Sequence, residues 1–134
     1  SYPGALEGAI KLKEVTYLHA EAMPAGEIKH HSIALIDKDF LTVAVAPDDD
    51  VAAKTMINMK EIKARGGPII AVTTMGNAAI TDVADDVIYV PKTLDMLSPI
   101  LSIIPLQLFA YYVGVERGVN LDRPRNLAKS VTVE

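Results

Sequence analysis

Three short apolar runs, rich in β-branched residues, are separated by segments with helical spacing, and this alternation limits what the chain can fold into. The runs span residues 40–46, 69–74 and 87–90. The first two are continuously apolar rather than alternating, which is typical of strands buried on both faces. Strands that alternate with helices favour a parallel sheet with helices packed on its two faces. The sequence therefore predicts an α/β fold, a three-layer α/β/α sandwich around a parallel sheet.

The segments outside these runs carry helix signals. Apolar residues recur at helical spacing from Leu6 to Ala20, and Pro24 ends the pattern, which predicts one long first helix. A further helical turn is expected over residues 25–31. The three aspartates at residues 48–50 are expected to cap and open a helix that ends near residue 65, and a short helical piece follows residue 77.

The order of the elements is unusual at its start. A doubly wound domain normally opens with a strand, whereas this chain opens with a helix. We therefore expect the first strand of the sheet to lie outside the printed sequence. An unfilled position at the sheet should make this chain alone poorly soluble or dependent on a partner.

Length, cysteine content and charge exclude several classes of function. The 134 residues suffice for one domain, expected over residues 1–119, followed by an irregular tail over residues 120–134. With no cysteine, disulfides and thiolate chemistry are excluded. The net charge of −4 and the lack of a basic cluster argue against nucleic-acid binding. The first residues do not resemble a signal peptide, so a cytoplasmic location is expected.

An uncharged run over residues 96–115 is long enough to span a membrane. Pro99, Pro105 and Gln107 interrupt it, and no basic residue lies just before it. We therefore expect apolar helices over residues 94–118 that pack as a buried pair or face another subunit, without a membrane.

The first predicted helix carries a charged face. Glu7, Lys11, Glu14, Leu18 and Glu21 follow one another at spacings of four, three, four and three residues. Lys11 and Glu14 are then neighbours, and a paired amine and carboxylate can move protons if their surroundings tune them. The same spacing also fits a solvated face that only stabilises the helix. Spacing alone favours the solvated face.

The remaining polar candidates are weaker. His19, His30 and His31 lack the spacing of a metal site, so no metal is expected, and a single imidazole acting as acid or base competes with a plain surface role. The basic segment over residues 123–130 could close over an anionic ligand or be a loose terminus. No glycine pattern for a nucleotide and no nucleophilic serine pattern occurs.

Five segments together resemble a known family. They span residues 5–14, 19–22, 26–30, 105–108 and 124–134, and the last reads Pro-Arg-Asn-Leu-Ala-Lys-Ser-Val-Thr-Val-Glu. In this order they resemble the second sugar isomerase (SIS) domain, with its C-terminal tail, of the glucosamine-6-phosphate synthase family. The resemblance implies a SIS-type, flavodoxin-like sheet, and a family strand that precedes Tyr2 and Pro3 would account for the absent first strand.

The resemblance also implies site residues. Glu14 matches the family's glutamate that moves a proton between C1 and C2 of the sugar, and Lys11 matches the lysine beside it. His30 matches the histidine that opens the sugar ring in the neighbouring subunit's site. Lys129 matches the lysine that forms a Schiff base with the open-chain ketose. Ala128, Lys129 and Glu14 would contact the substrate. These roles agree with carboxylate, imidazole and amine chemistry.

The activity implied is part of an isomerising glutamine–fructose-6-phosphate aminotransferase, which makes glucosamine 6-phosphate from fructose 6-phosphate and glutamine-derived ammonia without a cofactor. A glutaminase domain and a first SIS domain of the same polypeptide, and a homodimer or larger assembly, are the implied partners. This chain alone is expected to be inactive. The alternative is a non-catalytic SIS module that binds a sugar phosphate or dimerises. His31 stands where the family usually has glycine, so a left-handed backbone there would be strained.

Overall fold

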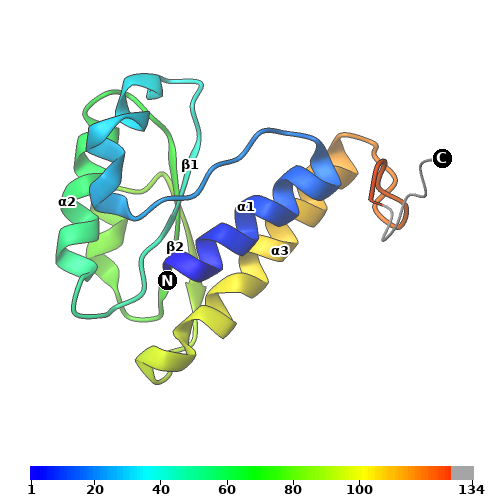
Figure 1. Ribbon diagram of the computed structural model, residues 1–134. Helices are drawn as coiled ribbons and strands as arrows, with labels where there is room; N and C mark the ends of the chain where they lie inside the picture. The colour runs from blue at the N-terminus through cyan, green and yellow to red at the C-terminus, as the bar shows by residue number, and fades with distance from the viewer. Residues whose placement is uncertain (128–134) are drawn as a thin grey trace.

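The sheet at the centre of the molecule has three parallel strands. A computed structural model describes residues 1–127 of the chain (Figure 1). The strands are β1 (Thr42–Val45), β2 (Ile69–Thr74) and β3 (Asp86–Val90), in the order β1-β2-β3. Thr42 pairs with Ile69 between the first two strands, and Ile70 pairs with Asp86 between the last two. The predicted α/β class with a parallel sheet is confirmed.

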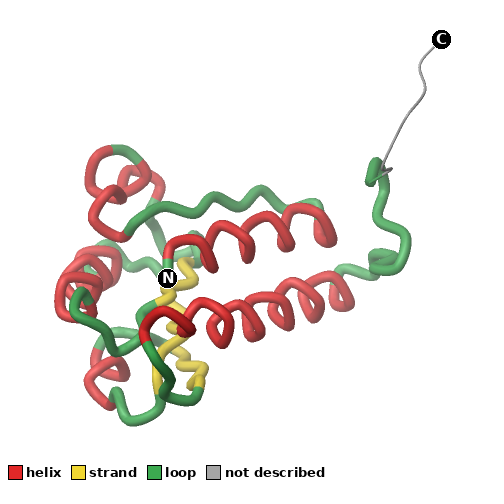
Figure 2. Tube along the Cα trace, turned by 60° about the horizontal axis from the view of Figure 1, so that its bottom comes forward, coloured by secondary structure: helices red, strands yellow, loops and turns green. Residues whose placement is uncertain are grey.

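Helices cover both faces of this sheet. One face carries α1 (Tyr2–Thr16) and α3 (Ser98–Glu116), and the other carries α2 (Ala52–Lys63) with three short 3₁₀ helices, η1 (Ala25–His30), η2 (Ser32–Leu35) and η3 (Ala78–Asp82) (Figures 1 and 2). A last 3₁₀ turn, η4 (Asp95–Leu97), leads into α3.

The side chains of the central strand, β2, point alternately to the two faces of the sheet and so contribute to a hydrophobic core on each face. Ile69 and Ala71 are fully buried and belong to the core under α2. Val72 points to the opposite core, where it lies with Val90 and Leu106. Successive side chains of a strand point to opposite faces, so one strand supports two helix layers. This arrangement is the predicted three-layer sandwich.

Two of the sequence predictions about strands need correction. The first strand is four residues long instead of seven and lies at a sheet edge, with all four residues half-buried. Phe40 and Leu41 are outside it and exposed, because a turn held by Asp37 occupies the preceding residues, where the Asp39 amide donates to the Asp37 carboxylate. An additional strand outside the printed sequence stays a prediction.

Glycines bring α1 and α3 together. The two helices run parallel and make the most extensive contact between helices in the described residues (Figure 1). A Cβ atom at Gly8 would lie 2.8 Å from Leu106 Cδ1, and one at Gly114 would lie 3.3 Å from the Val15 carbonyl oxygen. Hydrogen in place of a side chain therefore permits the close approach.

The apolar segment near the C-terminus forms one α-helix preceded by a 3₁₀ turn, which corrects the expected helix pair. Pro105 stands inside α3 and removes one helical hydrogen bond. By length and composition alone, residues 95–116 could cross a membrane, and 22% of the apolar window is buried in the molecule. A row of exposed apolar side chains continues along the helix: Ile100, Ile104, Leu108, Tyr111, Tyr112 and Val115. Its role as a protein-facing helix stays a prediction.

Two helix ends also differ from the prediction. α1 ends at Thr16, four residues before Ala20, because Tyr17 adopts the left-handed conformation with φ 61°. The aspartates at residues 48–50 precede α2 instead of opening it. α2 begins at Ala52, and the Asp49 carboxylate accepts the Val51 amide in the turn before the helix.

Candidate functional site

The charged face of α1 is the first candidate site. The Lys11 ammonium donates to the Glu14 carboxylate at 2.7 Å, and the Glu7 carboxylate lies 3.6 Å from the same ammonium. All three side chains are about one-third exposed. The prediction that Leu18 and Glu21 share this face is wrong, because both residues lie beyond the end of α1 at Thr16. The structure thus brings together two of the predicted site residues, Lys11 and Glu14.

The electrostatics of this face favour a charged lysine. The hydrogen bond to Glu14 is the largest influence, and together with the charges of Glu14 and Glu7 it raises the pKa of Lys11 above its ordinary value, although partial burial opposes the shift. Lys11 therefore carries its proton throughout the neutral range. A carboxylate that can accept a proton stands next to a fixed positive charge.

His30 lies apart from this pair. It ends η1, which packs against α2 on the side of the sheet opposite α1 (Figure 1). The Lys29 ammonium, one residue earlier, bonds to Glu61 of α2 at 2.8 Å and ties η1 to that helix. Within one chain, the structure does not bring His30 to Lys11 and Glu14.

The strain anticipated at His31 does not arise. Its φ is −153°, outside the left-handed region, so a side chain is tolerated there. Its Nδ1 atom lies 2.7 Å from the Ser32 hydroxyl oxygen at the start of η2. The loop that carries His30 is thus compatible with histidine in place of glycine.

Ala128 and Lys129, the remaining predicted site residues, lie outside the described residues. The segment before them returns to the end of α1. The Arg125 guanidinium lies over the Tyr17 ring at 4.0 Å, and the Arg125 amide donates to the Tyr17 hydroxyl at 2.9 Å. Sequence reasoning did not single out Tyr17. For Arg125, the basic composition of residues 123–130 was the one sequence feature that pointed to a functional role.

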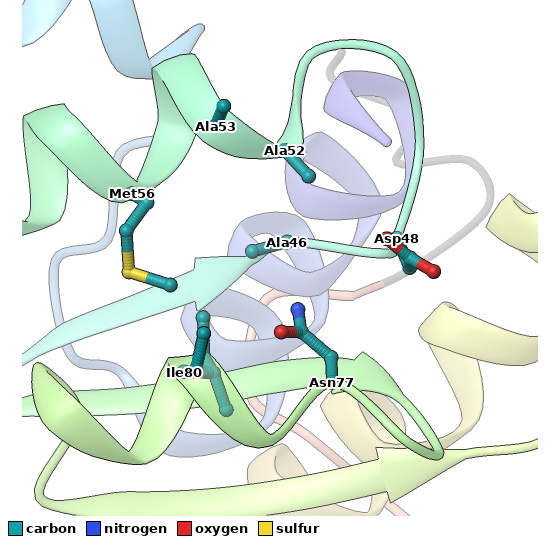
Figure 3. Close-up of a pocket in the computed structure, with 8 residues that line it drawn as sticks. Ala46, Asp48, Ala52, Ala53, Met56, Asn77 and Ile80 are labelled. Carbon is teal, nitrogen blue, oxygen red and sulfur yellow. The ribbon is translucent and has the colours of Figure 1, made fainter.

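A second candidate is a cavity at the carboxyl ends of β1 and β2, where parallel sheets usually bind ligands (Figure 3). Its volume is about 230 Å³. Two polar groups around it are hydrogen-bonded within the protein: the Asn77 side-chain NH2 donates to the Thr73 hydroxyl, and the Asp48 backbone amide donates to the Thr74 hydroxyl. The lining residues are mostly small and apolar: Ala46, Asp48, Ala52, Ala53, Met56, Asn77, Ala79 and Ile80.

This cavity offers little to a charged ligand. Asp48 is the one charged side chain in its lining and would repel a phosphate. Among residues 1–127, no three His, Cys, Asp or Glu side chains are grouped to hold a metal ion. The face of α1 is therefore the stronger candidate for chemistry.

Comparison with known proteins identifies relatives of this arrangement. Residues 1–117 match the family model described as "SIS domain". The glutamine–fructose-6-phosphate aminotransferase (isomerizing) of Caldanaerobacter subterraneus subsp. tengcongensis is 53% identical over 133 residues, which are 99% of this chain and 22% of that protein. The Thermus thermophilus enzyme of the same name is 54% identical over 132 residues, 98% of this chain and 22% of that protein. The chain thus spans about a fifth of the length of these curated relatives.

Solved structures agree with the sequence relatives. The C-terminal domain of glucosamine-fructose-6-phosphate aminotransferase from Francisella tularensis superimposes with a TM-score of 0.82 at 40% identity, over 91% of this chain and 34% of that one. Glucosamine-6-phosphate deaminase from Thermotoga maritima gives a TM-score of 0.76 at 25% identity, over 98% of this chain and 37% of that one. The resemblance inferred from the five sequence segments is confirmed.

Proposed function

The chain belongs to the SIS domain family, and on that basis we propose that it supplies the proton-transfer part of an isomerising glutamine–fructose-6-phosphate aminotransferase. The substrate would be fructose 6-phosphate with glutamine-derived ammonia, and the product glucosamine 6-phosphate. One observation carries the proposal: Glu14 is held on an accessible helix face at 2.7 Å from the Lys11 ammonium. An ion pair of this kind also occurs on plain solvated helix faces, and the family to which the chain belongs is what favours a catalytic use of it here.

The chemistry assigned to Glu14 is a transfer between adjacent carbons. Ammonia replaces the carbonyl oxygen at C2 of the open-chain ketose, by way of the Lys129 Schiff base described below, and the oxygen leaves as water, which gives an imine. Glu14 removes a proton from C1, and the electron pair forms a C1–C2 double bond as the imine nitrogen takes a proton. The same carboxyl group then returns its proton to C2, and the hydroxyl at C1 loses its proton to become the aldehyde.

Lys11 acts on charge in this scheme. It stays protonated, so it is not the base that takes the C1 proton. Its ammonium offsets the negative charge that develops on the C1 oxygen when the C1 hydroxyl loses its proton to become the aldehyde. The hydrogen bond to Glu14 at 2.7 Å holds the Lys11 ammonium beside the carboxylate before the substrate arrives.

Lys129 would act earlier than Glu14. An amine can condense with the C2 carbonyl to form a Schiff base, which ammonia then displaces by attack on the same carbon, releasing the lysine. Ala128 beside it would contact the substrate. Both assignments come from the resemblance of the last eleven residues to the family.

His30 would open the sugar ring by moving a proton between the ring oxygen and the anomeric hydroxyl. Its location across the sheet from Glu14 supports a role in the site of a second copy. We therefore propose a homodimer or larger assembly, in which a glutaminase domain and a first SIS domain of the same polypeptide complete each site.

The second candidate function is a non-catalytic SIS module that binds sugar phosphates or dimerises. The exposed apolar row along α3 favours a contact surface of this kind. The two functions differ at Glu14 and Lys129, because a binding module requires neither a base nor an amine nucleophile.

Kinetics of the full-length protein test the proposal. Glu14→Gln keeps the side-chain shape and removes the base, so turnover should fall by about 100-fold or more with KM for fructose 6-phosphate little changed. Glu7→Gln is the matched control, because Glu7 contacts the same ammonium one helical turn earlier, and its turnover should stay within about twofold of the parent. Equal turnover of the Glu14→Gln variant and the parent would contradict the proposal.

A further inference from the structure

The cavity beside the start of α2 is preformed, because hydrogen bonds join the two chain segments that border it (Figure 3). The Thr73 hydroxyl, fully buried in β2, donates to the Ala46 carbonyl just after β1 at 2.7 Å. One residue later, the Thr74 hydroxyl accepts the Asp48 amide at 3.1 Å. These bonds cross between neighbouring strands and hold the loops that follow them. The cavity therefore exists before a ligand enters.

Short side chains leave this space open. Alanine stands at four of the eight lining positions, residues 46, 52, 53 and 79. Ala46 and Ile80 are buried and form a firm wall, and in Figure 3 Met56 and Asp48 stand at opposite ends of the space. The cavity volume, about 230 Å³, exceeds the ~150 Å³ at which an engineered apolar cavity in another protein binds benzene. A small apolar ring therefore fits.

Asn77 supplies a polar group inside the cavity. Its side chain reaches into the space with the amide oxygen on the side of Ile80 (Figure 3). The amide nitrogen donates to the Thr73 hydroxyl at 3.0 Å, and this bond fixes which way the amide is turned. Among the hydrogen bonds formed within residues 1–127, none is accepted by the Asn77 amide oxygen. The polar group that faces the cavity is thus a hydrogen-bond acceptor.

A charged ligand gains no partner of opposite charge in this cavity. The Asp48 carboxylate opposes an anion, and it lies 3.7 Å from the Lys92 ammonium, which offsets its attraction for a cation. The first turn of α2 borders the same space, and the positive end of the helix dipole, about half a charge, also opposes a cation. An ion of either sign would lose its hydration without compensation.

We propose that this cavity binds a small uncharged molecule with an apolar body and one hydroxyl group. The apolar body would lie against Met56, Ile80 and the alanines, and the hydroxyl would donate to the Asn77 amide oxygen. The cavity lies on the α2 face of the sheet, whereas Lys11 and Glu14 belong to α1 on the other face (Figure 1). The binding site is therefore separate from the proposed isomerase chemistry and does not depend on it.

The test compares cyclohexanol with cyclohexanone, which have the same ring but of which only the alcohol donates a hydrogen bond. Full-length protein with isotope-labelled methionine methyl groups is titrated with each compound by NMR, and Met56→Leu identifies the Met56 signal. Cyclohexanol should shift this signal with a dissociation constant of about 1 mM, as expected for so small a ligand. Cyclohexanone should bind about fivefold more weakly, because it cannot donate to Asn77. Cyclohexylamine and cyclohexanecarboxylate, the charged analogues, should bind more weakly than the alcohol.

Three variants locate the binding site. The Ala52 side chain points toward Asn77 in Figure 3, so Ala52→Leu fills the cavity and should weaken cyclohexanol binding by about tenfold or more. Ala64→Leu, at the exposed residue that follows α2, is the matched control and should bind cyclohexanol as the parent does. Asn77→Leu removes the acceptor and should abolish the preference for the alcohol over the ketone.

Three outcomes would overturn the proposal. The first is a Met56 signal that shows no saturable shift with cyclohexanol up to about 50 mM, far above the expected dissociation constant. The second is equal affinity of the parent for cyclohexanol and cyclohexanone, and the third is parent-like cyclohexanol binding by a folded Ala52→Leu variant. The first two are measured on the parent protein alone, so they decide the matter even where a variant does not fold.

Discussion

Lys11 shares one ammonium group between two carboxylates, and this makes the pair sensitive to alkaline pH. The hydrogen bond to Glu14 is the main reason that the folded state raises the pKa of Lys11. The stabilisation is therefore complete below the ordinary lysine pKa, about 10.4, and is lost as the pH rises through the higher folded-state value. We predict that Glu14→Gln lowers the pKa of Lys11, measured by NMR of its side-chain Nζ or Cε, and weakens the alkaline fall in unfolding free energy. An unchanged Lys11 pKa would contradict the assigned cause.

The contribution of Asp85 to the unfolding free energy has the opposite pH dependence, because it is lost at acid pH. Its hydrogen bond with Lys63, followed by that with the Ile69 amide at 2.7 Å, lowers the pKa of this carboxyl. The stabilisation is present above the ordinary aspartate pKa, about 3.9, and is lost as the pH falls through the lower folded-state value. Asp85→Asn should lower the unfolding free energy near neutral pH. Between pH 5 and about 2, the unfolding free energy of the variant should also decrease less steeply with falling pH than that of the parent. Urea denaturation across this range measures both effects, and parallel curves for variant and parent would refute the prediction.

Residue spacing predicted only part of the site. Lys11 and Glu14 are three apart on a helix, so their contact follows from local geometry, and it is present at 2.7 Å. Their catalytic role came from the resemblance. The contact between Tyr17 and Arg125 joins residues 108 apart and depends on a left-handed tyrosine, which no local pattern indicates. Contacts of that kind are set by tertiary packing.

At the scale of elements, the glycines of α1 differ in how closely α3 approaches them. A Cβ atom at Gly8 would lie 2.8 Å from Leu106 Cδ1 and 3.0 Å from Leu106 Cβ, whereas one at Gly4 would meet the Pro99 carbonyl oxygen at 3.7 Å, an ordinary contact. Helix propensity alone would make either substitution by alanine stabilising, by about 0.5–1 kcal/mol.

We therefore predict opposite signs for the same substitution one turn apart. Gly8→Ala should lower the unfolding free energy by about 1–2 kcal/mol, because overpacking outweighs propensity, and Gly4→Ala should raise it by a few tenths of a kcal/mol. Denaturant titrations of the two variants beside the parent decide the matter. If both stabilise equally, the helices are not held together at Gly8.

The elements themselves were largely predictable, and their ends were not. Apolar runs rich in β-branched residues predicted all three strands, because such residues favour extended backbone, although only β2 of the three is buried along most of its length. Phe40 and Leu41 belong to the same apolar run and yet lie outside the strand, after a turn in which the Asp39 amide donates to the Asp37 carboxylate. The first helix was predicted to reach Ala20, but Tyr17 ends it through contacts from the far end of the chain.

At the scale of the whole molecule, the positions of His30 and Glu14 on opposite sides of the sheet predict sites shared between copies. In the full-length protein, a His30→Ala subunit mixed with a Glu14→Gln subunit should recover one intact site per heterodimer. About half of the dimers in an equal, randomly exchanged mixture would be such heterodimers, so activity should return to roughly a quarter of the parent level. Mixed dimers, confirmed by native mass spectrometry, that remain inactive would place His30 in the site of its own chain.

The exposed apolar row on α3 predicts that copies of the chain associate through this helix. Ile104 and Leu108 are each about half exposed and lie one helical turn apart on α3. Ile104→Lys combined with Leu108→Lys should reduce self-association of the chain in sedimentation velocity without loss of helical circular dichroism, because charged side chains oppose burial of the row. Unchanged association at equal concentration would show that this row is not the contact.

The central claim, that Glu14 carries the proton from C1 to C2, is tested most directly by isotope transfer. Fructose 6-phosphate bearing deuterium at C1 is given to the full-length parent and to its Glu14→Gln variant, and both the product and the recovered substrate are analysed by NMR. The account predicts that the parent moves deuterium to C2 or loses it to solvent, and that the variant leaves it at C1. Transfer or exchange by the Glu14→Gln variant at the parent rate would contradict the assignment of Glu14 as the base.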